Sequence, residues 1–311
     1  MDTSQKPELS VIVVISSDTT KSRADTVLLE VCLKALSDQA GPPATEIIVP
    51  YHAAVDGIEG LRKAFPDVVF VQAFELSSFT GKGGSREHHD ELRSVGLAVA
   101  RGDVIGLLED QAIPDEHWCA RAVEIQNSEF SVVGGAVENG VDSILNWAVY
   151  FCDFSRYQNP LPCGESGFAS DSNSAYKMSA LQSVRHLWAD SFHETLVNSA
   201  LMERGERIAL RPDLVAYQNR RGLSLGSAVR ERLVWGRSYA ATRCLLLGSK
   251  RFAYALLTPI LPMLMAFRLT VNVAKRRRGI RKCLEAFPVI LLLLSAWALG
   301  EMMGYLTAET D

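Results

Sequence analysis

The sequence predicts an α/β fold in which a mostly parallel sheet is covered by helices on both faces, followed by hydrophobic C-terminal membrane helices. Two patterns in the first third of the chain predict the sheet. Short apolar runs without polar alternation are typical of buried parallel strands, and stretches of helical period separate them. A third observation predicts the membrane helices: two long apolar segments lie near the end of the 311-residue chain.

Each predicted element rests on a local pattern of apolar residues. The expected strands are Val11–Ile15, Glu46–Val49, Val68–Val71 and Val104–Leu108. The expected helices are Arg23–Ser37, Gly57–Ala64, Ser85–Ala100, Glu194–Arg204 and Leu225–Leu247. The third helix, for example, has Leu92, Val95, Gly96 and Val99 at the i, i+3, i+4 and i+7 positions of one helical face.

Charge divides the chain into an acidic front and a basic rear. Residues 1–203 carry 14 Lys and Arg against 29 Asp and Glu, whereas residues 204–311 carry 18 against 7. The basic residues flank apolar runs, which favours anionic lipid headgroups over nucleic acid as a partner. We expect a catalytic domain over 1–222, an amphipathic interfacial helix region over 223–251 and a hydrophobic membrane anchor over 252–311.

The six cysteines form no CxxC pair, so neither a disulfide framework nor a zinc site is expected. The first residues are polar and contain no apolar run of the kind found in secretory signals. We therefore expect a protein of the cell membrane whose catalytic domain is cytoplasmic.

The two apolar segments differ in their fitness to cross a bilayer. Phe252–Ala274 contains two prolines and Arg268, whereas Phe287–Leu306 carries Glu301 as its single charge and is about one bilayer thickness long. Basic residues on both flanks of the first segment, including Lys275–Lys282, favour the same cytoplasmic side. We expect the first segment to be interfacial or re-entrant and the second to cross. A buried core helix is the alternative for either segment.

Ligands of open α/β sheets bind beyond the carboxyl ends of the strands. The candidate ligand contacts are therefore the residues that follow three of the predicted strands, namely Ser16–Asp18, Pro50–Tyr51 and Glu109–Gln111. The acids Glu109 and Asp110 could hold a divalent cation that bridges a nucleotide diphosphate. An ordinary strand-end turn with solvated acids is the alternative.

Six segments of the chain resemble, in order and spacing, the family 2 glycosyltransferases of the GT-A fold. They are SVIVVISSD, EIIVPYHAAVDG, RSVGLAVARGDVIGLLEDQAIPDEHW, SDSNSAYKMSAL, FHETLVNSALMERGERIAL and the closing PVILLLLSAWALGEMMGYL. The resemblance covers the whole chain, and its last segment is similar to the membrane end of many bacterial members.

The resemblance implies a Rossmann-like GT-A domain that performs an inverting sugar transfer from a nucleoside-diphosphate sugar. It implies a catalytic base at Glu194 and a Mg²⁺ or Mn²⁺ ion held by Asp110. The implied contacts to the nucleotide sugar are Ser16, Ser17, Tyr51, Arg93, Glu109 and Asp110.

Three departures from the family pattern concern the site directly. The second strand ends in Val49-Pro50-Tyr51 where the family has acids. Gln111 stands where the family commonly has a metal-binding carboxylate. The later acidic pair reads His193-Glu194, which leaves Glu194 as the expected base.

We therefore expect a glycosyltransferase that acts at the membrane on a lipid-linked or cell-envelope glycan acceptor, without a nucleic-acid partner. One alternative is a catalytically inactive nucleotide-sugar-binding or scaffold protein, which Gln111 and the altered second strand favour. Another is a nucleotidyltransferase, but this class needs a Gly- and Lys-rich loop after the first strand, where the sequence reads Ser16-Ser17-Asp18.

Three further groups of residues have more than one interpretation. Glu87–Asp90 (EHHD) has the composition of a metal cluster, but a solvated helix face is the favoured prediction, since consecutive helical positions point in different directions. Arg220 or Arg221 could meet a diphosphate or a lipid phosphate, and binding to the membrane surface is the equal alternative. Trp235 and Tyr239 suit an interfacial helix with aromatic rings at headgroup depth.

Overall fold

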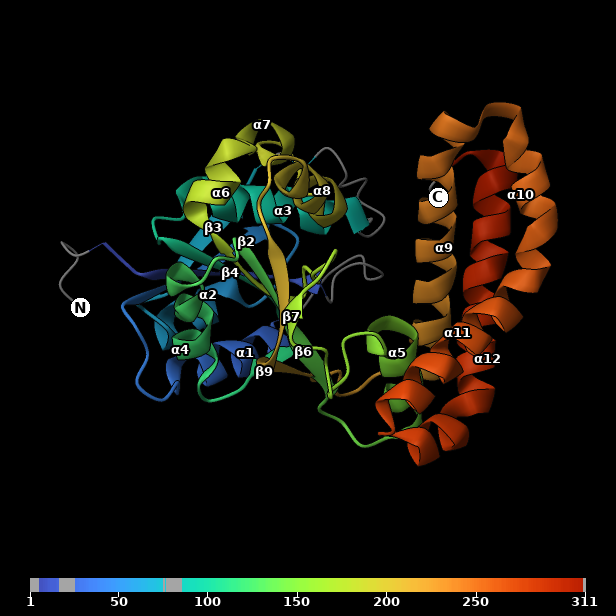
Figure 1. Cartoon of the computed structure of the whole chain (residues 1–311), viewed down its shortest axis with the longest axis horizontal. Helices are drawn as coiled ribbons and strands as arrows, with labels where there is room; N and C mark the ends of the chain where they lie inside the picture. The colour runs from blue at the N-terminus through green and yellow to red at the C-terminus, as the bar shows by residue number, and fades with distance from the viewer. Residues whose placement is uncertain (1–5, 17–25, 75, 77–85, 310–311) are drawn as a thin grey trace.

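The computed structural model describes residues 6–16, 26–74, 76 and 86–309. These residues form a globular α/β part and a bundle of long helices that lies beside it (Figure 1). The chain enters the bundle through a short segment that follows the last long strand of the sheet. The sheet and the bundle therefore meet along one side of the globular part.

The first half of the sheet is parallel, as predicted. Its strands are β3 (Val69–Ala73), β2 (Thr45–His52), β1 (Leu9–Val14) and β4 (Val104–Glu109), in that spatial order. The central strand β1 is buried at every position, which explains its unbroken apolar sequence. Leu9 lies opposite Thr45 on one side and Val104 on the other, so all three strands end at the same edge.

The second half of the sheet combines parallel and antiparallel strands, although most paired residues of the whole sheet lie in parallel ladders, as predicted. Its order continues from β4 through β8 (Asn173–Lys177), β6 (Val132–Asn139) and β9 (Ile208–Gln218) to β5 (Ala112–Pro114), with β7 (Gly164–Glu165) beside β9. β8 is antiparallel to β4 and β6, β9 is parallel to β6, and β5 and β7 are antiparallel to β9. Residues 131–180 lack a regular alternation of strands and helices, so their pattern did not reveal these directions.

Helices cover both faces of the sheet, as predicted. One face packs against α1 (Val27–Ser37), α2 (Ile58–Ala64) and α4 (Trp118–Val123), which continues into the 3₁₀ turn η2 (Glu124–Asn127). The other face packs against α3 (Arg86–Val99), α6 (Met178–Ser183), α7 (Arg185–Trp188) and α8 (Glu194–Glu203). The two apolar cores on either side of β1 hold the strand ends at fixed positions.

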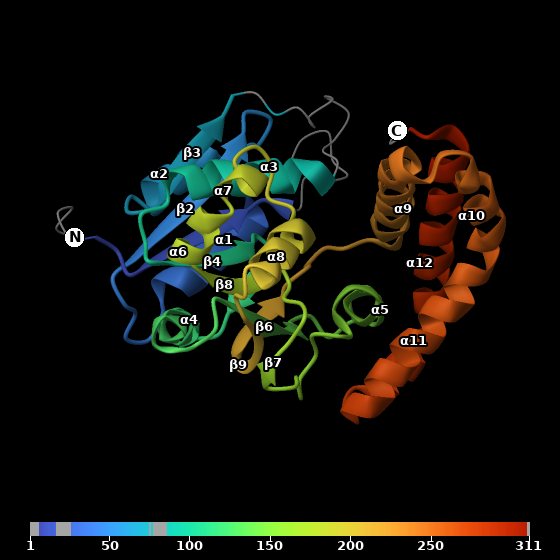
Figure 2. The ribbon, with the colours of Figure 1, turned by 45° about the horizontal axis from the view of Figure 1, so that its top comes forward.

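The bundle consists of α9 (Leu225–Leu247), a continuous helical run over Gly248–Arg276, and α12 (Ile280–Thr307). The run is formed by η3 (Gly248–Lys250), α10 (Arg251–Leu257), η4 (Thr258–Ile260) and α11 (Leu261–Arg276). Its two prolines fall in the first turns of η4 and α11, where a missing N–H does not break a helix. α9 faces the globular part, α10 lies on the far side, and α12 lies between them (Figure 2).

α9 and α12 approach each other closely because glycine lies at their contact. A Cβ atom on Gly300 would lie 2.1 Å from the backbone oxygen of Leu233, and one on Gly304 would lie 2.3 Å from that of Arg237. The first half of α12 also packs against α5 (Ile144–Phe154), a helix of the globular part. α12 is thus flanked by the globular part and α9 along its length.

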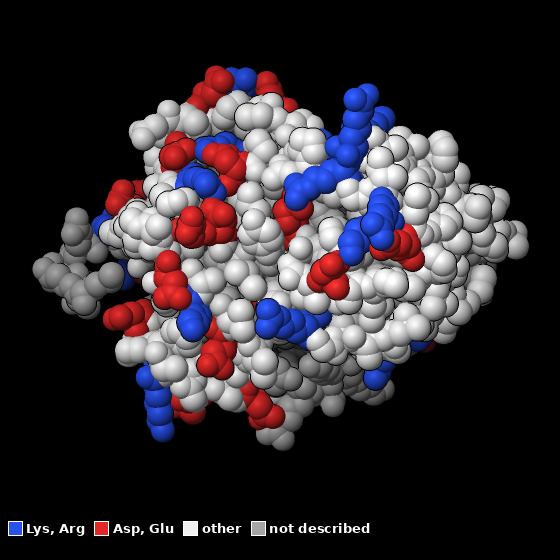
Figure 3. Space-filling model, turned by 90° about the horizontal axis from the view of Figure 1, so that it is seen from below, with Lys and Arg blue, Asp and Glu red and all other residues white. Residues whose placement is uncertain are grey.

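Two helical runs, Gly248–Arg276 and Ile280–Thr307, are long and apolar enough to cross a membrane. Length and composition alone do not separate a membrane span from a buried core helix. In its most apolar stretch the first run is 22% buried within the chain and the second is 44% buried, so the first exposes more apolar surface. Figure 3 shows the bundle end of one molecular face as almost devoid of charged side chains.

Candidate active site

A cleft of about 360 Å³ opens between the edge of the sheet and the bundle. Its lining combines residues from the strand ends, from α5 and α8, and from α9 and α12. The polar residues in this lining are Ser16, His89, Arg93, Glu109, Gln111, Asp153, Arg156, Ser170, Asp171, Ser172, Glu194, Gln218, Arg220, Glu231 and Arg232.

The direction of the strands explains why these residues meet. Glu109 ends β4 and Gln218 ends β9, and these two strands run in the same direction within the sheet. Asp171 and Ser172 precede β8, which runs the opposite way, so they reach the same edge. This is the carboxyl edge at which open α/β sheets bind ligands.

Arg93 of α3 is the most heavily paired charge at this edge. Its side chain is only 3% exposed, and its guanidinium lies 2.9 Å from Asp90, 2.9 Å from Asp171 and 3.5 Å from Glu109. Burial alone lowers the pKa of Arg93, but the surrounding carboxylates outweigh burial and raise it above its ordinary value. Arg93 thus stays charged and fixes three acids, rather than presenting a free cation to a ligand.

Glu194 is the first residue of α8, where the helix dipole favours a negative charge. Asn198, one turn further along, donates a hydrogen bond of 2.8 Å to the Glu194 carboxylate. The Tyr176 hydroxyl in turn donates to Asn198 at 3.2 Å. Burial, followed by the charges of Glu194 and Asp171, raises the pKa of Tyr176, so this hydroxyl remains a donor. The orientation of the carboxylate is therefore set from β8.

The run Glu87–Asp90 contradicts the prediction of a solvated helix face. His88 is fully buried, and His89 and Asp90 are only 5% and 8% exposed. Asp90 lies 2.9 Å from both Arg93 and His193, which caps the start of α8. The helix turns toward the sheet and α8 here, so its polar residues serve the cleft instead of facing solvent.

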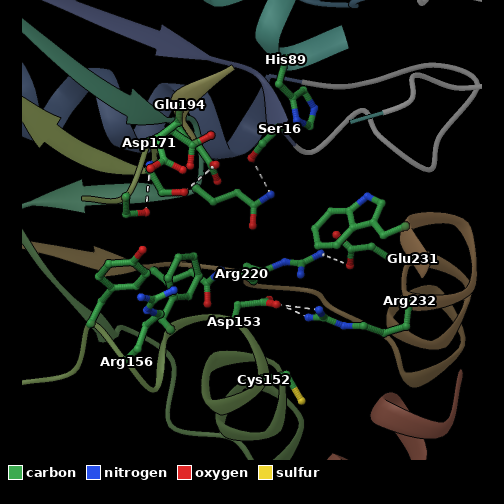
Figure 4. Close-up of a pocket in the computed structure, with 18 of the residues that line it drawn as sticks. Ser16, His89, Cys152, Asp153, Arg156, Asp171, Glu194, Arg220, Glu231 and Arg232 are labelled. Carbon is green, nitrogen blue, oxygen red and sulfur yellow. Dashed lines mark hydrogen bonds and ion pairs between the residues drawn. The ribbon is translucent and has the colours of Figure 1, made fainter. Parts of the chain in front are cut away.

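Arginines line the opposite wall of the cleft (Figure 4). Both terminal nitrogens of Arg232 on α9 donate to Asp153 at 2.6 Å. Burial lowers the pKa of Arg232, but Asp153 more than offsets burial and raises it. Arg220 donates to Glu231 at 2.7 Å, and the Arg156 guanidinium lies 3.9 Å from the centre of the Phe168 ring. This wall thus carries three guanidinium groups, two of which are paired with the carboxylates of Asp153 and Glu231.

Four of the residues predicted from sequence, Ser16, Arg93, Glu109 and Glu194, line this cleft together. Asp110 is 1% exposed and accepts hydrogen bonds from the Ser16 backbone and hydroxyl at 2.9 and 3.0 Å. Asp110 therefore lies behind Ser16 and is not among the described residues that line the cleft.

Two other residues predicted to contact the nucleotide sugar lie elsewhere. Tyr51 is 7% exposed, and its hydroxyl accepts a hydrogen bond from Arg62 at 3.1 Å. It belongs to the apolar core and is not among the described residues that line the cleft. Ser17 lies outside the described residues.

The side chains that the structure describes around the cleft do not form a complete metal site. Within the described part of the chain, no three His, Cys, Asp or Glu side chains cluster so that they could hold an ion. A cation that also binds substrate phosphates needs only one or two carboxylates from the protein. The acids at the end of β4 are already engaged, Asp110 by Ser16 and Glu109 by Arg93 and by Ser172 at 2.8 Å.

A second cavity of about 430 Å³ adjoins the cleft. Asp171, Glu194, Trp235 and Trp297 line both spaces. The rest of its wall comes from α3, from the start of α8 and from α9, namely Asp90, His193, Thr195, Leu196, Ser238, Tyr239, Thr242 and Arg243. The Glu194 carboxylate thus stands at the boundary between a polar cleft and a cavity with aromatic walls.

Several residues of the two cavities were not singled out from the sequence. Asp171 follows no predicted strand, and Asp153 ends a helix in the region without regular pattern. Trp235 and Tyr239 were predicted to lie at lipid headgroup depth, but they line the cavities next to Glu194. The sequence around these residues does not indicate which neighbours their side chains contact.

No protein-family model and no curated protein sequence matches the chain. Among solved structures, its fold is similar to that of a mannosyltransferase from Pyrobaculum calidifontis in complex with GDP-Man and Mn²⁺. The TM-score is 0.53 and the identity 17%, over 96% of this chain and 88% of that one. It is also similar to residues 1–349 of S. aureus TarS in complex with UDP-GlcNAc, with a TM-score of 0.50 and 13% identity over 94% and 90% of the two chains. The predicted fold class, a Rossmann-like α/β sheet covered by helices and followed by apolar helices, is thereby confirmed.

Replacing Arg93 with Met should destabilise the protein by about 3–5 kcal/mol, because the change leaves buried carboxylates without their cation. Urea unfolding of the full chain in detergent measures this loss. Arg101→Met is the matched control, since Arg101 also pairs with a carboxylate, Glu46, but is 60% exposed. The control should lose less than about 1 kcal/mol. Equal losses in both variants would contradict the structural role assigned to Arg93.

Proposed function

We propose that the chain is an inverting glycosyltransferase that transfers a sugar from a nucleoside-diphosphate sugar to a lipid-linked or cell-envelope acceptor at the membrane. The observation that carries this proposal is the position of Glu194, a carboxylate on the boundary between two adjoining cavities. One cavity would take the donor and the other the acceptor. A second route to the same conclusion is the family resemblance in the sequence.

In this proposal Glu194 acts as the general base. It accepts the proton of the acceptor hydroxyl while that oxygen bonds to the anomeric carbon and the bond to the diphosphate breaks. The hydrogen bond from Asn198 keeps the carboxylate oriented, as a proton acceptor within hydrogen-bond reach must be. An acceptor that enters from the second cavity would attack from the face opposite the leaving group, which inverts the anomeric centre.

The guanidinium groups across the cleft suit a nucleoside diphosphate. Arg156 and Arg220 line the wall opposite Glu194, and planar guanidinium groups bind phosphate oxygens in a bidentate manner. Arg220 also pairs with Glu231 at 2.7 Å, so a diphosphate would have to share Arg220 with that carboxylate. Negative charge develops on the diphosphate as its bond to the sugar breaks, so fixed cations there would stabilise the transition state. Ser16 and Glu109, on the sheet side, are proposed to contact the nucleotide sugar.

The second cavity is proposed to hold the acceptor. Its aromatic walls suit a sugar ring or an apolar chain, and the Nε1 group of Trp235 has no hydrogen-bond partner among the described residues. In this division of labour, residues 1–222 form the catalytic domain, and α9 within 223–251 supplies one wall of the acceptor cavity. Residues 252–311 anchor the enzyme, and we propose that the catalytic domain is cytoplasmic.

Glu194→Gln should lower kcat by about 10²- to 10⁴-fold, because the amide cannot accept the proton of the acceptor. Binding of the nucleotide sugar, measured by calorimetry, should change little, since Gln keeps the size of the side chain. Glu203→Gln, at the other end of α8, is the matched control and should keep full activity. Loss of donor binding equal to the loss of turnover would move the base to another residue.

Tyr239→Ala should raise the acceptor KM by roughly three- to tenfold, because an aromatic contact in the second cavity is lost. Hydrolysis of the nucleotide sugar without acceptor should be unaffected. Tyr254→Ala is the control, since both rings lie 5.3 Å from the Arg243 guanidinium but Tyr254 is not among the described residues that line the cavity. An unchanged acceptor KM in Tyr239→Ala would remove the acceptor from this cavity.

We propose that transfer uses a divalent cation, Mg²⁺ or Mn²⁺, which would neutralise charge on the leaving group. Asp110, the residue predicted to hold it, lies behind Ser16, so it would reach the cation only after its hydrogen bonds with Ser16 break. In a thermal-shift screen, UDP-, GDP- or dTDP-sugars should then stabilise the protein more with Mn²⁺ than with chelator. Asp110→Asn should abolish that difference. Activity of the unmutated protein that survives complete chelation would refute the cation proposal while leaving the transferase proposal in place.

A further inference from the structure

The outer side of α10 and α11 presents a continuous apolar surface, here termed the apolar face. Its exposed residues are Phe252, Leu256, Leu257, Ile260, Met263, Leu264 and Phe267. Leu256, Ile260, Met263 and Phe267 follow the i, i+4, i+7, i+11 spacing of one helical side. Leu256 is 81% exposed and Phe267 is 67% exposed, and apolar patches of this kind mark interaction or membrane sites.

Basic residues border this face at both ends. The sequence from Gly248 to Cys283 contains nine Lys and Arg and no Asp or Glu. Lys250 and Arg251 lie at one end of the apolar face, while Arg268 and Lys275 lie beyond its other end. An apolar helix side with cationic borders is complementary to the acyl chains and headgroups of an anionic lipid leaflet.

The basic connector between α11 and α12 is fastened to the globular part. Arg276 donates to the backbone oxygens of Pro160 at 2.7 Å and Arg156 at 3.1 Å. Arg278 pairs with Glu138 at 2.9 Å, and Lys282 pairs with Asp142. These contacts hold the lower end of the bundle against the catalytic domain.

The helix α9 also lies beside the globular part, to which its first third is joined by the Arg232–Asp153 and Glu231–Arg220 pairs. α9 lies against α12 on one side, and on the other it lines both cavities through Trp235. The long side of the bundle thus lies beside the globular part (Figures 1 and 2). If α12 crossed a bilayer in this arrangement, the carboxylates of Asp153, Asp171 and Glu194 would be carried to hydrocarbon depth. Charged groups at that depth are expensive, by several kcal/mol each.

We propose that the chain does not cross the bilayer but lies on one leaflet, with the apolar face inserted among anionic lipids and α12 running behind it. This inference rests on the proposed membrane location, but not on the proposed sugar transfer. It replaces the expectation that Phe287–Leu306 crosses the membrane. Both ends of the chain then lie on the same side of the bilayer.

Flotation of the full-length protein with vesicles tests the attachment. Phosphatidylcholine vesicles that contain phosphatidylglycerol should bind the protein, and high salt or omission of phosphatidylglycerol should weaken binding. The double variant Met263→Glu/Phe267→Glu should lower the bound fraction about tenfold or more, because it places charge in the inserted face. The matched double variant Val69→Glu/Val99→Glu alters exposed apolar residues of the globular part and should bind like the unmutated protein.

Protease protection tests the topology on the same vesicles. Tags at the two ends of the chain should be removed together when protease is added outside, whereas protection of either tag alone would establish a crossing and overturn the proposal. Flotation of the Met263→Glu/Phe267→Glu variant at the unmutated level would also overturn it. A third outcome would also overturn the proposal: an unmutated protein that is a dimer and a variant that is a monomer, with equal flotation. The apolar face would then be the contact between two copies of the chain.

Circular dichroism and thermal unfolding check that the variants fold. Sugar transfer, measured on the same preparations, separates the two proposals, because an absence of transfer with normal flotation would refute the enzyme function and leave the attachment standing. Normal transfer to a soluble acceptor with no flotation would refute the attachment and leave the enzyme function standing.

Discussion

The buried guanidinium of Arg93 is the interaction on which the rest of the site depends. It joins Asp90 on its own helix to Glu109 at the end of β4 and to Asp171 before β8. Asp90 extends the network to His193 at the start of α8. Carboxylates brought this close together without a cation would repel one another. These acids can therefore lie together only around this arginine.

The helix α9 joins the wall of the cleft to the rest of the bundle. Its inner side carries Arg232 and Trp235 into the cleft wall, and its other side packs on α12 through glycine contacts. A shift of the bundle against the globular part would break the Arg232–Asp153 pair and reshape both cavities. The proposed attachment to a leaflet acts on the bundle, so it also affects the geometry of the proposed acceptor site.

Much of the fold followed from local patterns. The apolar runs of β1 and β4 and the helical periods of α3 and α9 are visible because burial on one or two sides leaves a periodic trace. Strand direction in the second half was not visible, since a short strand such as β8 has the same composition whichever way it runs. Likewise, His89 and Asp90 look like solvated residues until α8 and the sheet close over them.

The sequence by itself determined the succession of strands and helices in the first hundred residues, that Ser16, Glu109 and Glu194 stand at element ends, and that two long apolar segments close the chain. The tertiary structure alone decided that Asp110 lies behind Ser16, that Arg93 binds acids, and that α9 turns its aromatic residues toward Glu194. The physical reason is that periodicity records whether a side chain is buried. The identity of the neighbour that buries it depends on contacts between segments far apart in the chain.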